Sequence, residues 1–96
     1  MSRALVTGAG QRLGREMAVY LAGRGYDVAV HYATSKDGAD ETVAQIETAG
    51  GRGHALRADL LDDQETRQLF ATARDSLGGD ITCLVNNASI FEYDTI

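Results

Sequence analysis

The pattern of apolar and polar residues predicts four strands that alternate with three helices. Apolar runs of strand length occupy residues 3–7, 26–32, 52–58 and 81–86. Apolar residues recur at helical spacing in the three longer segments between them, residues 11–24, 36–49 and 62–77. The expected order of the elements is therefore β-α-β-α-β-α-β, with one helix between each pair of successive strands.

The same pattern predicts which positions are buried. The expected apolar stripes of the three helices consist of Leu13, Met17, Ala18 and Leu21, of Ala39, Val43, Ile46 and Gly50, and of Thr66, Leu69, Phe70, Ala73 and Leu77. In the second strand, Val28 and Val30 are expected on one face and His31 on the other. The fourth strand is almost continuously apolar, which is typical of a strand covered on both faces.

Strict alternation of strands and helices predicts a parallel sheet with right-handed crossovers and helices on both faces. The sequence thus matches the first βαβαβαβ portion of a doubly wound α/β domain. Residues 87–96 fit only a loop and the start of another helix. We therefore expect residues 1–96 to be the N-terminal part of a single larger domain, whose absent remainder would leave the fourth strand as an open, apolar edge.

Composition excludes several classes of partner. Fourteen acidic and nine basic side chains give a net charge of −5, which argues against binding to nucleic acid or to an anionic membrane. No apolar run has transmembrane length, and no signal peptide precedes the first strand. Cys83 has no partner for an internal disulfide, and with only His31 and His54 it offers no metal-ligand set. We expect a cytoplasmic protein without a bound metal.

A glycine-containing turn, residues 7–14, joins the first strand to the first helix. Backbone N–H groups converge at such a helix N-terminus, where the partial positive charge favours a pyrophosphate. Gly8 would allow a sharp turn, and Gly14 would allow the helix to lie close to the strand. Nucleotide binding and a plain structural turn both explain this motif when it is taken alone.

Two further motifs follow at the ends of the third and fourth strands, Asp59–Leu60 and Asn86-Asn87-Ala88. Together with Thr7-Gly8 and Gly14, they resemble the short-chain dehydrogenase/reductase family over the whole chain. The resemblance implies a Rossmann-like fold and hydride transfer from a nicotinamide to a C=O or C=N carbon. The implied cofactor contacts are Gly8, Leu13 and Gly14 at the turn, Asp59 and Leu60 at the adenine, and Asn87 and Ala88 along the ribose–nicotinamide path.

Two departures from the family pattern narrow the resemblance to the pteridine reductase branch. Arg12 replaces the middle glycine of the turn, and Ser89 replaces the glycine that follows the Asn-Asn-Ala motif. With the His31–Tyr32 pair and Phe91, these residues imply that Arg12 lies beside the phosphates and substrate and that His31 and Tyr32 contact the cofactor. They also imply that Ser89 contacts both cofactor and substrate, and that Phe91 stacks on a pterin. A solvated phosphate contact for Arg12 and a core or interface role for Phe91 stay open.

The end of the second strand favours NADPH over NADH. An NAD site needs an acid there, but residues 31–36 contain none, and Asp27 lies at the opposite end of the strand. Arg12, Ser35 and Lys36 instead offer donors and positive charge for a 2′-phosphate. Because pteridine reductases often have a basic residue in place of Thr34, that position departs from the branch.

Two of the motif residues also have purely structural interpretations. Asp59 could cap the third helix, because it precedes the start of that helix by a few residues. Asn86, at the end of the fourth strand, could tie the central strands together instead of binding cofactor.

The catalytic pair of the family, Tyr-x-x-x-Lys on a helix, does not occur on any of the three predicted helices. The only lysine is Lys36; Tyr32 precedes it by four positions, but it lies on the predicted second strand, whereas the family's pair lies on one helix. No catalytic residue is therefore assigned, and the 96-residue chain is expected not to turn over substrate.

The resemblance implies an NADPH-dependent reductase of a carbonyl compound or pterin, forming a homodimer or homotetramer when full length. A 3-oxoacyl-type carbonyl reductase and a non-catalytic dinucleotide-binding sensor are the competing interpretations.

Overall fold

The computed structural model describes residues 2–8 and 12–87 and contains the seven predicted elements in the predicted order. Each strand and helix begins and ends within two residues of its expected position. The elements are β1 (Arg3–Thr7), α1 (Arg12–Gly23), β2 (Asp27–Tyr32), α2 (Lys36–Thr48), β3 (Arg52–Arg57), α3 (Asp63–Leu77) and β4 (Cys83–Asn86).

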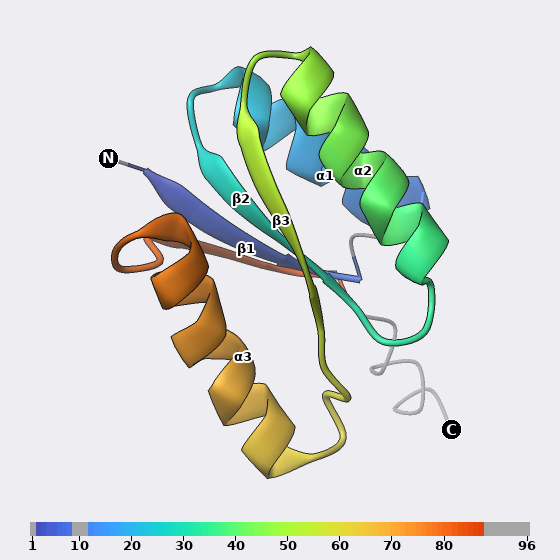
Figure 1. Cartoon of the computed structure of the whole chain (residues 1–96), viewed down its shortest axis with the longest axis vertical. Coiled ribbons are helices and arrows are strands. Elements are labelled where there is room, and N and C mark those ends of the chain that lie inside the picture. The colour runs from blue at the N-terminus through green and yellow to red at the C-terminus, as the bar shows by residue number, and fades with distance from the viewer. Residues whose placement is uncertain (1, 9–11, 88–96) are drawn as a thin grey trace.

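The four strands form one parallel sheet in the order β3-β2-β1-β4. In the centre of the sheet, Leu5 of β1 lies opposite Ala29 of β2 on one side and Leu84 of β4 on the other. Helices α1 and α2 cover one face of the sheet and α3 covers the other (Figure 1). This arrangement confirms the predicted doubly wound α/β architecture.

Two buried clusters, one on each face, hold the layers together. On one face, Val28 and Val30 of β2 pack with Ile46 of α2 and with the alanines of α1. On the other face, Leu5 and Ala29 pack with the buried stripe of α3, Leu69, Ala73 and Leu77. The predicted alternation of side chains along β2 is therefore confirmed, because each residue lies on the face opposite to that of its neighbour.

The predicted buried stripe of α1 is wrong in part. Leu13 and Met17 are 58% and 36% exposed, whereas the buried positions are Gly14, Ala18 and Ala22. These three small residues are spaced four apart and bring the helix backbone close to the sheet. The larger apolar side chains are displaced to the flank of the helix, where they line an open groove beside β4.

Two other expectations of burial are also incorrect. Phe70 of α3 is 40% exposed, and Leu84 of β4 is 50% exposed. In the part of the chain that the structure describes, β4 pairs only with β1 and its residues alternate between half-buried and exposed. Without further elements over it, an apolar strand at this edge cannot be covered on both faces. In α2, Thr42 is buried and Gly50 is exposed, so the stripe there begins with Ala39 and ends at Ile46.

Candidate functional site

The carboxyl ends of the parallel strands meet at one edge of the sheet, where β1 runs into the predicted phosphate-binding turn. Gly8 directly follows β1 and has a φ of +67°. L-residues with a side chain rarely adopt this left-handed conformation, whereas glycine adopts it freely. The structure thus supports the reason that the sequence suggested for a glycine at this position. Residues 9–11 lie outside the described part of the chain.

The ring of His31 joins three strand ends at this edge. The Gly8 N–H donates to Nδ1 at 3.0 Å, and Nε2 lies 2.9 Å from the carbonyl oxygen of Ala58. Because an amide can only donate, Nδ1 must accept, and the ring proton therefore lies on Nε2 and is donated to Ala58. His31 is 2% exposed, so both nitrogens are engaged with backbone inside the protein. Its predicted direct contact with a cofactor would require this arrangement to change.

Burial lowers the pKa of His31 below 6.5, and the hydrogen bond to Ala58 opposes that shift without overcoming it. The unfolded chain therefore takes up a proton before the folded chain does. The neutral His31 ring therefore contributes fully to the free energy of unfolding above the pKa of the unfolded chain, about 6.5. This contribution is lost as the pH falls from there towards the lower pKa of the folded chain.

We expect the free energy of unfolding to fall more between pH 7.5 and pH 5.5 in the native chain than in His31→Asn, measured by urea denaturation at each pH. The carboxylates contribute to both proteins, so the difference between them isolates His31. His54→Asn is the matched control, because His54 is exposed. An equal pH response of the native chain and His31→Asn would contradict the assignment of a buried neutral ring.

Thr7 joins β1 to β4 at the same edge, a role that sequence reasoning missed. Its Oγ1 accepts the Asn87 N–H at 2.9 Å and donates to Asn86 Oδ1 at 3.1 Å. The structure therefore supports the structural interpretation of Asn86, which ties neighbouring strands together. Asn87 is half-buried and its backbone position is held by Thr7. A threonine as the last residue of a strand, directly before the glycine of the turn, was the available signal.

The segment after β3 brings Asp59 and Leu60 to this edge. The Asp59 carboxylate accepts the Leu61 N–H at 2.9 Å, and the Asp59 N–H donates to Glu65 Oε1 at 2.9 Å. Asp62, whose side chain accepts two backbone N–H groups, is the N-cap of α3. The interpretation of Asp59 as the cap of this helix is therefore wrong. Leu60 is half-buried and packs against the cluster beneath α3.

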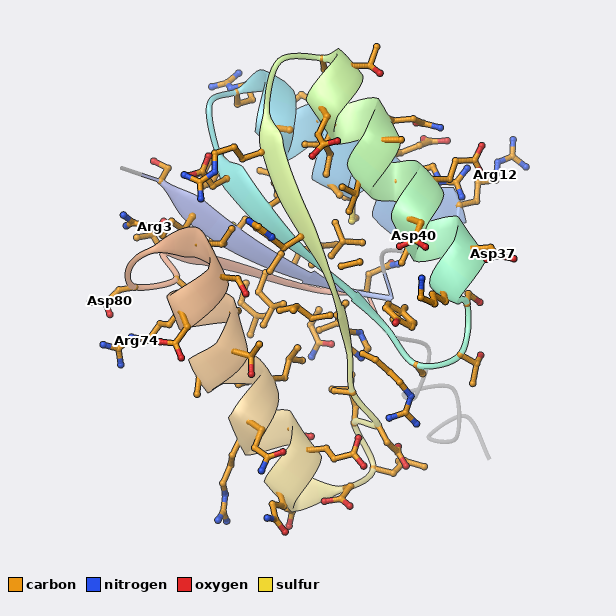
Figure 2. The ribbon with its side chains drawn as sticks, in the orientation of Figure 1. Arg3, Arg12, Asp37, Asp40, Arg74 and Asp80 are labelled. Atoms are coloured by element: carbon orange, nitrogen blue, oxygen red, sulfur yellow. The ribbon has the colours of Figure 1, made fainter. Side chains whose placement is uncertain are left out.

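The residues predicted to hold a 2′-phosphate lie at the starts of α1 and α2. Arg12 is exposed, Tyr32 at the end of β2 is half-buried, and Ser35 is the exposed N-cap residue of α2, with no side-chain capping bond. Arg12 lies at the same end of the molecule as Asp37 and Asp40 (Figure 2). As predicted, no acid lies at the carboxyl end of β2.

Lys36 has an ion-pair partner that the sequence did not indicate. Its Nζ donates to Asp40 Oδ2 at 2.8 Å, one helical turn along α2. Asp40 raises the pKa of Lys36 through this hydrogen bond and its charge. The ammonium is therefore fully charged at neutral pH, but a phosphate would compete with Asp40 for it. At the other end of β2, Asp27 pairs with Arg52 at 3.4 Å, away from the predicted cofactor edge.

Arg15 holds the first turn of α2 against α1, another contact that sequence reasoning missed. Its guanidinium donates to Thr42 Oγ1 at 3.1 Å and to the Gly38 carbonyl at 3.3 Å, and it lies 3.3 Å from Glu41. These partners are more than 20 residues away along the chain. The contact fixes the helix that carries Ser35 and Lys36 relative to the helix that carries Arg12.

Three predicted residues, Ala88, Ser89 and Phe91, lie outside the described residues. Within residues 2–8 and 12–87, no group of three or more metal-ligating side chains comes together. Nor is any helix in those ranges long and apolar enough to cross a membrane.

The fold and the turn after β1 define a Rossmann-like α/β protein. A family profile described as short chain dehydrogenase matches residues 2–96. The chain belongs to this family, which is a class of oxidoreductase enzymes. The part of the sequence-based resemblance that concerns the family as a whole is therefore confirmed.

Known relatives share this part of their sequence with the chain. The 3-oxoacyl-[acyl-carrier-protein] reductase FabG of Staphylococcus epidermidis is 40% identical over 87 residues, which are 91% of this chain and 35% of that protein. The short-chain dehydrogenase/reductase homolog YusS of Bacillus subtilis is 40% identical over 90 residues, 94% of this chain and 82% of that protein. The chain thus spans about a third of the length of the first of these relatives.

Solved structures show the same backbone. The promiscuous reductase LugOII, which catalyses keto-reduction at C1 during lugdunomycin biosynthesis, is 44% identical with a TM-score of 0.87. The landomycin C-6 ketoreductase LanV, solved with bound NADP and rabelomycin, is 39% identical with a TM-score of 0.83. Each comparison covers 93% of this chain and 38% of the other.

Proposed function

We propose that this chain forms the cofactor-binding half of an NADPH-dependent reductase that transfers a hydride to a carbonyl carbon. The observation that carries the proposal is the left-handed Gly8 at the end of β1, held in place beside the start of α1 at a sheet edge where β2 ends without an acid. Such an edge suits the pyrophosphate and a phosphorylated ribose together.

In this proposal the residues of the chain bind and orient the cofactor. Gly8 and Gly14 let the turn and α1 approach the pyrophosphate, while Leu13 flanks it. Asp59 and Leu60 contact the adenine, and Asn87, Ala88 and Ser89 line the path to the nicotinamide. NADPH supplies the hydride when it is bound. The family's proton donor belongs to a Tyr-x-x-x-Lys pair on one helix, which α1, α2 and α3 do not carry; Tyr32 and Lys36 have that spacing, but Tyr32 ends β2 and Lys36 begins α2.

The preference for NADPH rests on charge at the adenosine ribose. Arg12, Ser35 and Lys36 offer cationic and hydroxyl donors near the ends of β1 and β2, where an NAD-selective site would need a carboxylate. The structure of LanV contains NADP, which supports the same preference in a relative. His31 and Tyr32, at the end of β2, are the other predicted cofactor residues; we propose a direct contact for Tyr32, because both ring nitrogens of His31 are bonded to backbone.

Equilibrium titration of the 96-residue chain with NADPH and with NADH, at one fixed salt concentration, tests the proposal. We expect NADPH to bind at least about ten-fold more tightly, because each charged hydrogen bond to the 2′-phosphate contributes about 1.5–3 kcal/mol. Equal dissociation constants would overturn the NADPH assignment. No binding of either nucleotide by a folded chain would overturn the proposal as a whole.

Lys36→Ala is expected to weaken NADPH binding about five-fold and to leave NADH binding unchanged, because only NADPH carries the 2′-phosphate. Asp40→Asn is expected to strengthen NADPH binding about two-fold by releasing Lys36 from its ion pair. Fluorescence titration measures both changes. Arg24→Ala, at the far end of α1, is the control for a general loss of positive charge. An equal effect of Lys36→Ala on both nucleotides would contradict a phosphate contact.

Ketones or 3-oxoacyl thioesters are the proposed substrates, because FabG, LugOII and LanV are all named for keto-reduction. A pterin substrate would instead rest on Arg12, Ser89 and Phe91, which would contact the flat ring.

A hybrid of residues 1–96 with the remainder of the staphylococcal FabG distinguishes these substrates. We expect it to oxidise NADPH with a 3-oxoacyl thioester. Turnover of a pterin alone would favour the pteridine reductase branch, and NADPH binding without any turnover would favour a non-catalytic sensor. Homo-oligomerisation, as a dimer or tetramer, is proposed for a full-length protein only.

A further inference from the structure

His31 contacts the phosphate-binding turn through its first amide. The Gly8 N–H, which directly follows β1, points at Nδ1 of a ring that is 2% exposed. That amide is therefore committed to the protein interior and does not point at a bound pyrophosphate. With this N–H held at the ring, the left-handed φ of Gly8, +67°, sets the direction in which the chain leaves β1.

The second nitrogen of the ring fixes the tautomer. Nε2 lies 2.9 Å from the Ala58 carbonyl, which can only accept, so the proton of the neutral ring is on Nε2. Nδ1 is then unprotonated and can accept from Gly8. The Ala58 N–H in turn donates to the Tyr32 carbonyl at 3.1 Å, so the end of β3 is itself held by the residue that follows His31. The ring is thereby supported on both sides.

We infer that His31 is a positioning residue: its ring, oriented by Ala58, holds the Gly8 amide and thereby sets the conformation of the turn that receives the cofactor pyrophosphate. The expected consequence of this inference, tighter nucleotide binding, rests on the proposed function. It replaces a direct contact between His31 and the cofactor with an effect transmitted through Gly8. The hydrogen bond itself, from the Gly8 N–H to an unprotonated Nδ1, does not depend on any nucleotide.

Two substitutions separate the two hydrogen bonds of the ring. His31→Asn places an amide oxygen near the position of Nδ1, so it retains an acceptor for the Gly8 N–H and loses the reach to Ala58. His31→Gln places an amide nitrogen near the position of Nε2, so it retains the donor to Ala58 and loses the acceptor for Gly8. Both variants leave one buried backbone group without its partner, so their costs in stability are of the same kind.

Hydrogen exchange of the Gly8 amide and NADPH titration, measured on the 96-residue chain and both variants, test the inference. We expect His31→Asn to keep the protection of the Gly8 amide and an NADPH affinity within about three-fold of the native chain. We expect His31→Gln to lose that protection and to bind NADPH at least about ten-fold more weakly while still folded. Equal losses in the two variants would show a purely structural role and overturn the inference.

The ring tautomer provides a test that needs neither variant nor nucleotide. The ¹⁵N shifts of His31 in the native chain should show a protonated Nε2 and an unprotonated Nδ1. The opposite tautomer would overturn the inference even if His31→Gln failed to fold. If the native chain showed the expected tautomer and a protected Gly8 amide but bound no nucleotide, the proposed function would fail and the link between His31 and Gly8 would stand.

Discussion

Gly8→Val is expected to reduce NADPH affinity at least about ten-fold and to lower the free energy of unfolding by about 1–3 kcal/mol. The φ of Gly8 is +67°, and a residue with a side chain pays about 1–2 kcal/mol to adopt this conformation, more when it is β-branched. Relief of the strain requires φ at this position to rotate, which changes the course of the backbone through the turn unless the peptide bonded to His31 moves instead. Binding and chemical denaturation of the same preparation measure the two effects.

Gly25→Val is the matched control for this strain. Gly25 also has a positive φ, +96°, and has no atom within 4 Å of an added Cβ. It lies between α1 and β2, at the amino edge of the sheet and away from the turn. We expect a similar loss of stability and unchanged NADPH affinity for the folded protein. If the two variants lost affinity equally, the effect of Gly8→Val would reflect general destabilisation rather than the turn.

Leu5→Ala is expected to destabilise the fold by about 2–5 kcal/mol, the largest effect among single substitutions considered for stability. Leu5 lies in the central strand, is fully buried and packs among the residues beneath α3. Truncation removes its buried surface and leaves a cavity that the surrounding sheet cannot fill. For a chain of this length, with about 5–14 kcal/mol of total stability, that loss is a large fraction of the whole. Urea denaturation, analysed for the midpoint and the slope, measures it.

Two variants define what the Leu5→Ala result means. Leu84→Ala removes the same atoms from the neighbouring position on β4, where the side chain is 50% exposed, and should cost less than about 1.5 kcal/mol. Leu5→Met keeps the volume in the core and should also cost less than about 1.5 kcal/mol. A loss at Leu84 as large as that at Leu5 would show that the exposed face of β4 is covered in solution.

Local patterns in the sequence determined the elements, their order and the class of fold. Helix and strand periods are set by neighbouring residues, so the seven segments lie within two residues of their predicted ends. Alternation of the two periods implies a parallel sheet, because a parallel connection needs a crossover helix. Gly8 was identifiable for the same reason, since a glycine between a strand and a helix marks a tight turn.

Burial on α1 was harder to predict from the sequence. The larger apolar residues Leu13 and Met17 match a helical stripe, but the sheet instead contacts the small residues of the adjacent stripe. Which stripe of a helix meets the sheet depends on how closely the backbones approach, and this depends on the strands opposite. The exposure of Phe70 and Leu84 likewise depends on what lies over them rather than on their own hydrophobicity.

Only the tertiary structure decided how the candidate site is held. The bonds from Gly8 to His31 and from Asn87 to Thr7 join residues 23 and 80 positions apart, and no local pattern encodes such a distance. A histidine at the end of a strand can face solvent as a ligand or turn inward to neighbouring strand ends. The order β3-β2-β1-β4 selects the second outcome, because it places β2 between the other two strands whose ends the ring joins.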